Sequence, residues 1–209
     1  MYKTTVKYVL MAACLLMATL VNAKGISDPY KLVEDVAEKT FARIAADQDK
    51  IKASPEHLKT VVTEELLPHV DYRYAAYKVL GKNFKKYNKQ QRKAFVGAFK
   101  DYLVSTYAGV FTLYKNQKVI FEPSQPFTGK KVVIIRTKVI DEGKPDIHID
   151  FKVRNAKKKG WLAYDMVAEG VSLLDSKRAE LNGMIRQQGL DSVTELLIKK
   201  AQRPIKAKS

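Results

Sequence analysis

The spacing of apolar residues changes twice along this 209-residue chain, and that change constrains its fold more than any other feature. Over residues 27–114, apolar residues recur every three or four positions, as they do on one face of a helix. Over residues 118–166 they alternate or run together as in strands, and helical spacing returns over residues 172–202. Helices, then strands, then helices predict an α+β fold that forms one domain.

The longest predicted helix covers residues 89–114. Its apolar face includes Phe99, Leu103, Tyr107 and Phe111, which are spaced by four residues. An apolar face this wide predicts a helix that contacts two other elements at once.

Other helix boundaries are marked by short signals. Asp28 followed by Pro29 predicts one helix start, and Ser54 followed by Pro55 predicts another. Gly81 is expected to end a third helix.

Four strands are predicted from "KVIFEP", "KKVVIIRTKVI", "DIHIDFKVR" and "GWLAYDM". Their connections are short, so neighbouring strands should pair antiparallel as a four-stranded meander. In the third strand, apolar residues alternate with polar ones that include His148 and Asp150. One face of the sheet is therefore expected to be wet, and the other to be covered by helices with an apolar cavity between them.

Residues 1–23 have the form of a cleaved signal peptide. Lys3 and Lys7 precede an apolar run, and Val21-Asn22-Ala23 resembles a cleavage site. Cleavage there would leave residues 24–209 without cysteine, because Cys14 is the only one in the chain. This predicts export, and the lack of disulfides favours the periplasm. A lipoprotein signal at Cys14 or an uncleaved anchor are the alternatives.

The chain is strongly basic, with a formal net charge of +16 that falls to +14 without Lys3 and Lys7. Such a surface suits phospholipid headgroups or an acidic protein, and export argues against nucleic acid. The lysines are scattered, however, so they also fit a merely solvated surface. The basic end "RPIKAKS" is expected to fray.

Ser172 lies in a strand–turn–helix pattern like that of a hydrolase nucleophile elbow. That elbow needs Gly-x-Ser-x-Gly, and Leu174 takes the place of the second glycine. A nucleophilic serine also needs a histidine base, and none of His57, His69 and His148 is suitably placed. Ser172 is therefore predicted to cap a helix.

Two further interpretations remain open. Asp165 and Glu169 are four residues apart and could serve acid–base chemistry in a small enzyme with an apolar pocket. A periplasmic adaptor with a solid core and no ligand is the other. The chain has no metal-ligand spacing and no phosphate loop, so no cofactor is predicted.

The combined motifs resemble the MlaC family, also called the toluene-tolerance or phospholipid-binding family. They are "DPYKLVEDVAEKTFARI", "ELLPHVDYRYAAYKVLGKNFK", "QQRKAFVGAFKDYLVSTYAGVF" and "YDMVAEGVSLL" followed by "GLDSVTELL". The resemblance covers about residues 27–202.

This resemblance implies a monomeric periplasmic carrier of glycerophospholipid that makes and breaks no bond. Its partners would be an outer-membrane lipoprotein–porin complex and the ring protein of an inner-membrane ABC transporter. The lipid slot is expected between the long helix and the sheet, and it would supply shape and desolvation. Its predicted lining residues are Phe99, Leu103, Tyr107, Phe111, Val133, Ile135, Ile149, Phe151, Val153, Met166, Val171 and Leu174.

Overall fold

The computed structural model describes residues 28–115, 117–141 and 143–206. The predicted signal peptide, residues 1–23, lies outside the described residues. The helices are, in chain order, α2 (Pro29–Ala46), α3 (Gln48–Ala53), α4 (His57–Val61), the π-helix η1 (Val62–Leu66), the 3₁₀ turn η2 (Leu67–His69), α5 (Tyr72–Leu80), η3 (Gly81–Lys86), α6 (Lys89–Phe111), η4 (Lys157–Lys159) and α7 (Leu173–Ala201). The strands are β1 (Lys118–Phe121), β2 (Val132–Ile140), β3 (Ile147–Asn155), β4 (Trp161–Ala168) and β5 (Val171–Ser172).

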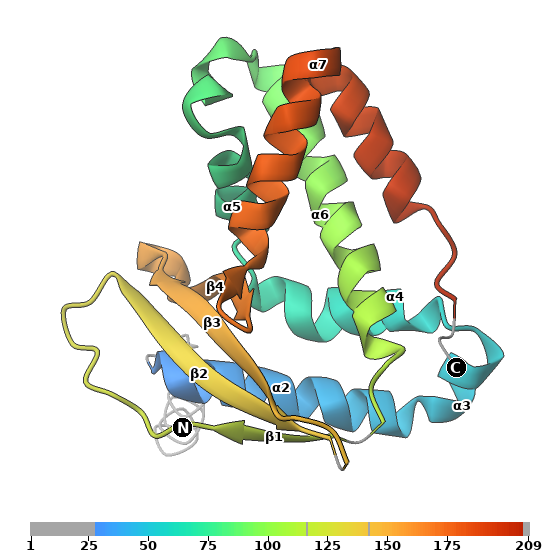
Figure 1. Ribbon diagram of the computed structural model, residues 1–209, viewed down its shortest axis with the longest axis vertical. Coiled ribbons are helices and arrows are strands. Elements are labelled where there is room, and N and C mark those ends of the chain that lie inside the picture. The colour runs from blue at the N-terminus through green and yellow to red at the C-terminus, as the bar shows by residue number, and fades with distance from the viewer. Residues whose placement is uncertain (1–27, 116, 142, 207–209) are drawn as a thin grey trace, which may run out of the picture.

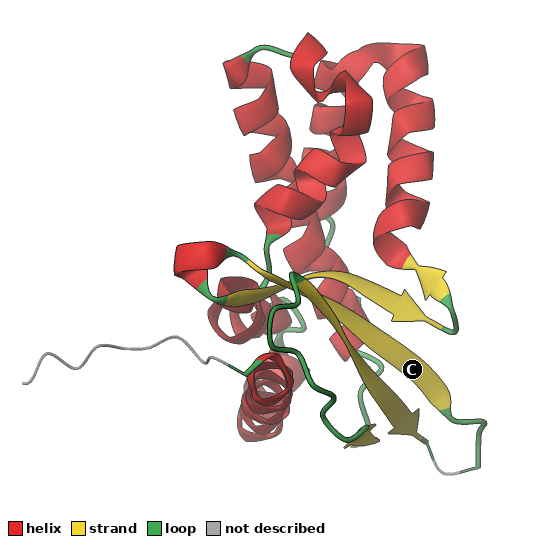
Figure 2. Ribbon diagram, turned by 90° about the vertical axis from the view of Figure 1, so that its left-hand side faces the viewer, coloured by secondary structure: helices red, strands yellow, loops and turns green. Residues whose placement is uncertain are grey.

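The sheet is an antiparallel meander in the order β1-β2-β3-β4-β5. It lies between α2 on one side and a bundle of α5, α6 and α7 on the other (Figure 1; Figure 2). The predicted α+β fold with a meander sheet is therefore confirmed. The sheet has five strands rather than four, because the two residues of β5 pair with the end of β4. A strand of two residues is too short to show alternation in sequence.

The apolar face of the sheet packs against α2. Val133 lies opposite Val153, and Ile135 lies opposite Phe151, so their side chains share one face. Val133, Ile135 and Val153 are all buried there with Leu32 and Val33 of α2. This face is closed by side-chain packing.

Two further apolar clusters involve α6, as its wide apolar face predicts. One cluster joins α5, α6 and α7 and includes Phe95, Phe99 and Leu181. The other joins α2, α4 and the C-terminal half of α6 and includes Ile44 and Val104. Each half of α6 therefore serves a different core.

Most of the predicted helix boundaries are confirmed. Asp28 accepts hydrogen bonds from the first backbone N–H groups of α2, and Gly81 ends α5 with a φ of 55°. The prediction that Ser54 caps the next helix is wrong. The Ser54 carbonyl accepts a hydrogen bond from the His57 N–H in a turn, so α4 begins only at His57, with Glu56 as its N-cap.

The polar face of the sheet is only partly open to water. His148 is exposed, as predicted. Arg154 instead reaches the bundle, where it donates to the Asp71 carboxylate at 2.6 Å and stacks over the Tyr74 ring at 4.2 Å. This contact joins β3 to α5.

Helix α7 consists of two straight pieces that meet at Gly189, whose φ of 81° and ψ of 164° are not helical. The chain folds back at this residue along α6 (Figure 1). Within the described residues, every helix is too short or too polar to cross a membrane.

Candidate functional site

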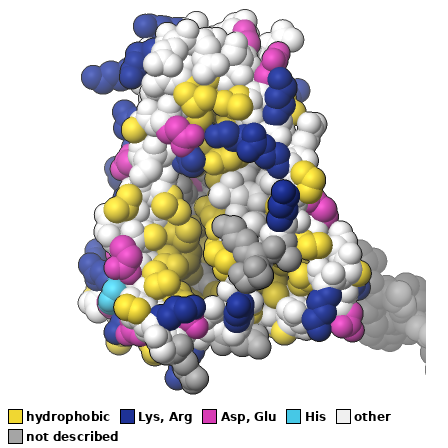
Figure 3. All heavy atoms as spheres, turned by 45° about the vertical axis from the view of Figure 1, so that its right-hand side comes forward, with side chains coloured by type: hydrophobic (Ala, Val, Ile, Leu, Met, Phe, Trp, Pro, Cys, Tyr) yellow, Lys and Arg dark blue, Asp and Glu magenta, His cyan; other side chains and the backbone are white. Residues whose placement is uncertain are grey.

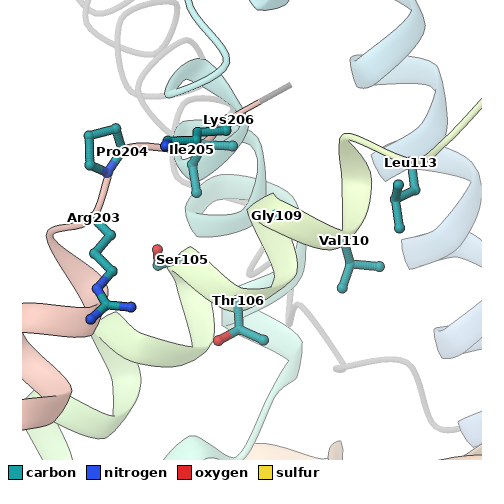
Figure 4. A pocket seen from close by; sticks show the side chains of 9 residues that line it. All are labelled: Ser105, Thr106, Gly109, Val110, Leu113, Arg203, Pro204, Ile205 and Lys206. Carbon is teal, nitrogen blue, oxygen red and sulfur yellow. The ribbon is translucent and has the colours of Figure 1, made fainter. Parts of the chain in front are cut away.

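A hollow of about 650 Å³ runs along the C-terminal half of α6. Its second wall is the chain that follows α7, residues 203–206, which we call the C-terminal tail (Figure 4). The lining residues are Ser105, Thr106, Gly109, Val110, Leu113, Arg203, Pro204, Ile205 and Lys206. A volume of this size falls within the ordinary range for small-molecule pockets.

The α6 wall is apolar surface that no other element covers. Val110 on α6 is 50% exposed, and Leu113 in the turn that follows α6 is 48% exposed, which is high for large apolar residues beside a core helix. Gly109 directly precedes Val110 in α6 and leaves open space, since no heavy atom beyond its own stretch of helix lies within 4 Å of where its Cβ would be. Uncovered apolar surface beside open space is typical of a binding site.

The C-terminal tail is held against the helices by hydrogen bonds. The Ile205 N–H donates to the Glu56 carboxylate at 2.5 Å, and Lys59 Nζ donates to the carbonyls of Ala201 and Arg203 at 3.1 and 3.3 Å. The Lys59 ammonium and the Ile205 N–H together lower the pKa of Glu56. The expectation that the C-terminal end frays is therefore wrong for residues up to Lys206; residues 207–209 lie outside the described residues.

The Ile205 side chain adds an apolar anchor, because it packs on the cluster formed by α2, α4 and α6. Seen from the side where the tail lies, the molecule has a furrow with hydrophobic side chains gathered on both sides (Figure 3). The hollow thus combines a rigid helix with a fixed segment that comes from the far end of the chain.

A second hollow of about 320 Å³ also borders α6, with Lys59, Thr63 and Lys100 among its lining residues. Neither hollow lies on the sheet face that α2 covers. None of the residues that line the two hollows belongs to a strand, so the slot predicted between the long helix and the sheet stays a prediction.

The structure distributes nine of the twelve predicted lining residues over three separate cores. Five of them are buried: Phe99, Val133, Ile135, Val153 and Leu174. Six are partly buried: Leu103, Tyr107, Phe111, Ile149, Phe151 and Met166. Val171 is 57% exposed on β5. Phe99, Leu103 and Leu174 meet in the bundle, Tyr107 and Phe111 in the α2–α4–α6 cluster, and Val133, Ile135, Phe151 and Val153 against α2.

Sequence reasoning missed the residues that line the larger hollow. Periodicity counts Val110 and Leu113 among the apolar positions of the long helix, but the predicted slot took only residues such as Tyr107 and Phe111 from it. The available signal was Gly109, a residue of poor helix propensity inside an otherwise strong helix.

Asp165 joins β3, β4, β5 and α7 at one buried point. Its carboxylate accepts hydrogen bonds from Lys152 Nζ at 2.9 Å, Ser172 Oγ at 2.7 Å and the Leu174 N–H at 3.0 Å. Ser172 in turn accepts from the Asp175 N–H at 3.0 Å, so Ser172 caps α7 as predicted. These contacts are those of a structural junction.

Glu169, the other carboxylate considered for acid–base chemistry, also binds backbone. It accepts a hydrogen bond from the His148 N–H at 2.5 Å. Burial raises the pKa of Tyr107 to about 12, and the negative charge of the Asp165 carboxylate contributes to this rise. Among the described residues, no group of three or more His, Cys, Asp and Glu side chains could hold a metal ion.

The model of the family described as MlaC protein matches residues 34–199. The chain belongs to the MlaC family. The intermembrane phospholipid transport system binding protein MlaC of Haemophilus influenzae is 35% identical to it over 203 residues, which cover 95% of each chain. This relative bears the name of a lipid-transport protein.

A solved structure has a similar fold. It is a phospholipid-binding protein from Ralstonia solanacearum in complex with a phospholipid, and it matches with a TM-score of 0.75 at 21% identity. The match covers 83% of this MlaC protein and 97% of that chain. At this identity the likeness concerns the fold alone.

Proposed function

We propose that this MlaC protein is a periplasmic carrier of glycerophospholipid. It takes lipid at one membrane and releases it at the other, exchanging it between an outer-membrane lipoprotein–porin complex and the ring protein of an inner-membrane ABC transporter. The exchange helps to keep the two leaflets of the outer membrane different. The protein works as a monomer and makes or breaks no bond.

A carrier is needed because free lipid cannot cross water at a useful rate. Burying one methylene group is worth about 0.8 kcal/mol, so two acyl chains of about 14 methylenes each would cost roughly 20 kcal/mol to expose. A carrier replaces that exposure with protein contacts. The contacts must be apolar and must be able to open.

The observation that carries the proposal is the apolar hollow beside α6, bounded by Val110 and Leu113 and by the fixed tail. Its volume of about 650 Å³ is below the ~1,000 Å³ end of the ordinary range, where a slot for a two-chain lipid belongs. We infer that the hollow widens when lipid enters and that docking on a membrane partner promotes this opening. The family membership and the names of the relatives support the same role.

Charge would assist both encounters. With the signal peptide removed, the net charge of +14 attracts anionic headgroups and acidic docking surfaces. Such attraction weakens as salt is added, because exposed charges are screened over about 10 Å at 0.1 M ionic strength.

The enzyme alternative has less support, because Asp165 and Glu169 are both occupied by structural hydrogen bonds. Native mass spectrometry of protein purified without detergent distinguishes the possibilities. A stoichiometric mass of two-chain phospholipid is the expected result. An empty protein would favour the adaptor with a solid core, and turnover of a small molecule that Asp165→Asn abolishes would favour the enzyme.

A further inference from the structure

We propose that Arg203 and Lys206 of the C-terminal tail hold the phosphate group of the bound lipid. The tail would then be the headgroup wall of the hollow, while the α6 wall takes an acyl chain. This inference rests on the proposed function, because it assumes that a phospholipid is the ligand.

The two cations belong to the same hollow as the uncovered apolar surface. Arg203 and Lys206 flank Pro204 and Ile205 on the tail, and all four residues line the same hollow as Val110 (Figure 4). A ligand that fills this space therefore meets apolar side chains on α6 and two positive charges on the tail. A phospholipid combines those chemistries, because an anionic phosphate is joined through glycerol to acyl chains.

The cations are available for a ligand. Within the described part of the chain, neither Arg203 nor Lys206 forms an ion pair, and no acidic side chain lines the hollow. The nearby Lys59 and Lys200 differ, since Lys59 pairs with Glu56 at 2.8 Å and Lys200 pairs with Glu180 at 3.5 Å. The two cations that border the hollow thus have no acidic partner among the described residues.

The tail backbone is already in place before a ligand arrives. The hydrogen bonds from Lys59 to the Arg203 carbonyl and from Ile205 to Glu56 fix the backbone on either side of Pro204. Holding the backbone in advance lowers the entropy cost of binding. The planar guanidinium of Arg203 can also donate two parallel hydrogen bonds to one phosphate.

The test compares lipid release by two double variants. R203Q/K206Q removes the proposed phosphate contacts, and K85Q/K86Q removes the same charge from exposed lysines of η3, at the other end of the bundle (Figure 1). Each protein is purified with its lipid, and release to phosphatidylcholine vesicles is followed by native mass spectrometry. We expect R203Q/K206Q to release lipid about fivefold faster than wild type and K85Q/K86Q to match wild type.

Adding salt should speed release from wild type and should change release from R203Q/K206Q far less. Inorganic phosphate at the same ionic strength as sodium chloride should have no additional effect, because the site needs the acyl chain as well. Equal release rates from both double variants, or displacement of lipid by inorganic phosphate alone, would overturn the inference and leave the carrier role standing. A wild-type protein that carries no phospholipid would overturn the proposed function itself, and the inference with it.

Discussion

Filling the larger hollow from the α6 side should expel the lipid without harming the fold. Gly109→Leu adds a branched apolar side chain at a position where the new Cβ meets no heavy atom within 4 Å beyond its own stretch of helix, and the rest of the side chain extends beside the hollow that Gly109 lines. It also replaces glycine inside a helix by a good helix former, which favours the helix by up to about 0.8 kcal/mol. For a protein of this size, the melting temperature should rise by about 2 °C.

The same substitution should weaken lipid binding, and this loss of binding free energy should be larger than the gain in stability. If the new side chain displaces about three methylene groups of an acyl chain, about 2.4 kcal/mol of binding free energy is lost. That loss corresponds to roughly 50-fold weaker retention, because each 1.4 kcal/mol is a factor of ten. The assay is native mass spectrometry of detergent-free protein, with thermal unfolding measured on the same preparation.

Gly97→Leu is the matched control. Gly97 lies on the same helix, also has nothing within 4 Å of its Cβ position, and does not line the hollow. The two variants should melt alike, and only Gly109→Leu should lose lipid. If Gly109→Leu keeps its lipid as well as Gly97→Leu does, the hollow beside α6 is not the lipid site. If both variants lose lipid, the loss reflects a change in the helix rather than a filled hollow.

Three other predictions concern the sheet, its junction with α7, and Tyr107 of α6. Val153 is fully buried, so Val153→Glu should unfold the protein, whereas Val171 is 57% exposed on β5, so Val171→Glu should stay folded by circular dichroism. Val171 does not line the larger hollow, so the folded Val171→Glu should keep its copurifying lipid; loss of lipid would instead place the lipid site at β5, as predicted from sequence. Asp165→Ala should lower the free energy of unfolding, measured in urea, by about 3 kcal/mol, because the buried donors lose their acceptor. Ser172→Ala should lower it by only about 1 kcal/mol, and equal losses would contradict the buried junction. Burial raises the pKa of Tyr107 from 10.0 to about 12, so its contribution to stability is complete below pH 10 and is lost as pH rises to about 12. The free energy of unfolding of Tyr107→Phe should therefore decline less than that of wild type between pH 10 and pH 12. An equal decline in both proteins would refute this assignment to Tyr107.

The architecture could be predicted because it depends on local periodicity. The alternation around Ile149 and Phe151 specified a strand with one apolar face, and the spacing of three and four around Phe99 specified a helix. The register that brings Val133 opposite Val153 also follows from short connections and matching faces.

The candidate site could not be predicted in the same way, because it depends on which apolar faces stay uncovered. Periodicity marks Val110 and Phe111 alike as residues of an apolar helix, yet only Val110 is half exposed. The difference arises from tertiary packing, in which α2 covers one side of the C-terminal half of α6. The tail was missed because its anchors, Glu56 and Lys59, lie far away in sequence and leave no local pattern.

The anchoring of the C-terminal tail also affects the order in which the protein is completed. The hydrogen bond from Ile205 to Glu56 joins residues 149 positions apart. Contacts with such large sequence separation form late in folding, because a long loop must close first. A ribosome completes α6 well before it adds Arg203. The hollow therefore acquires its second wall only after residues 203–206 have been added, and a nascent chain that already contains α6 still lacks it.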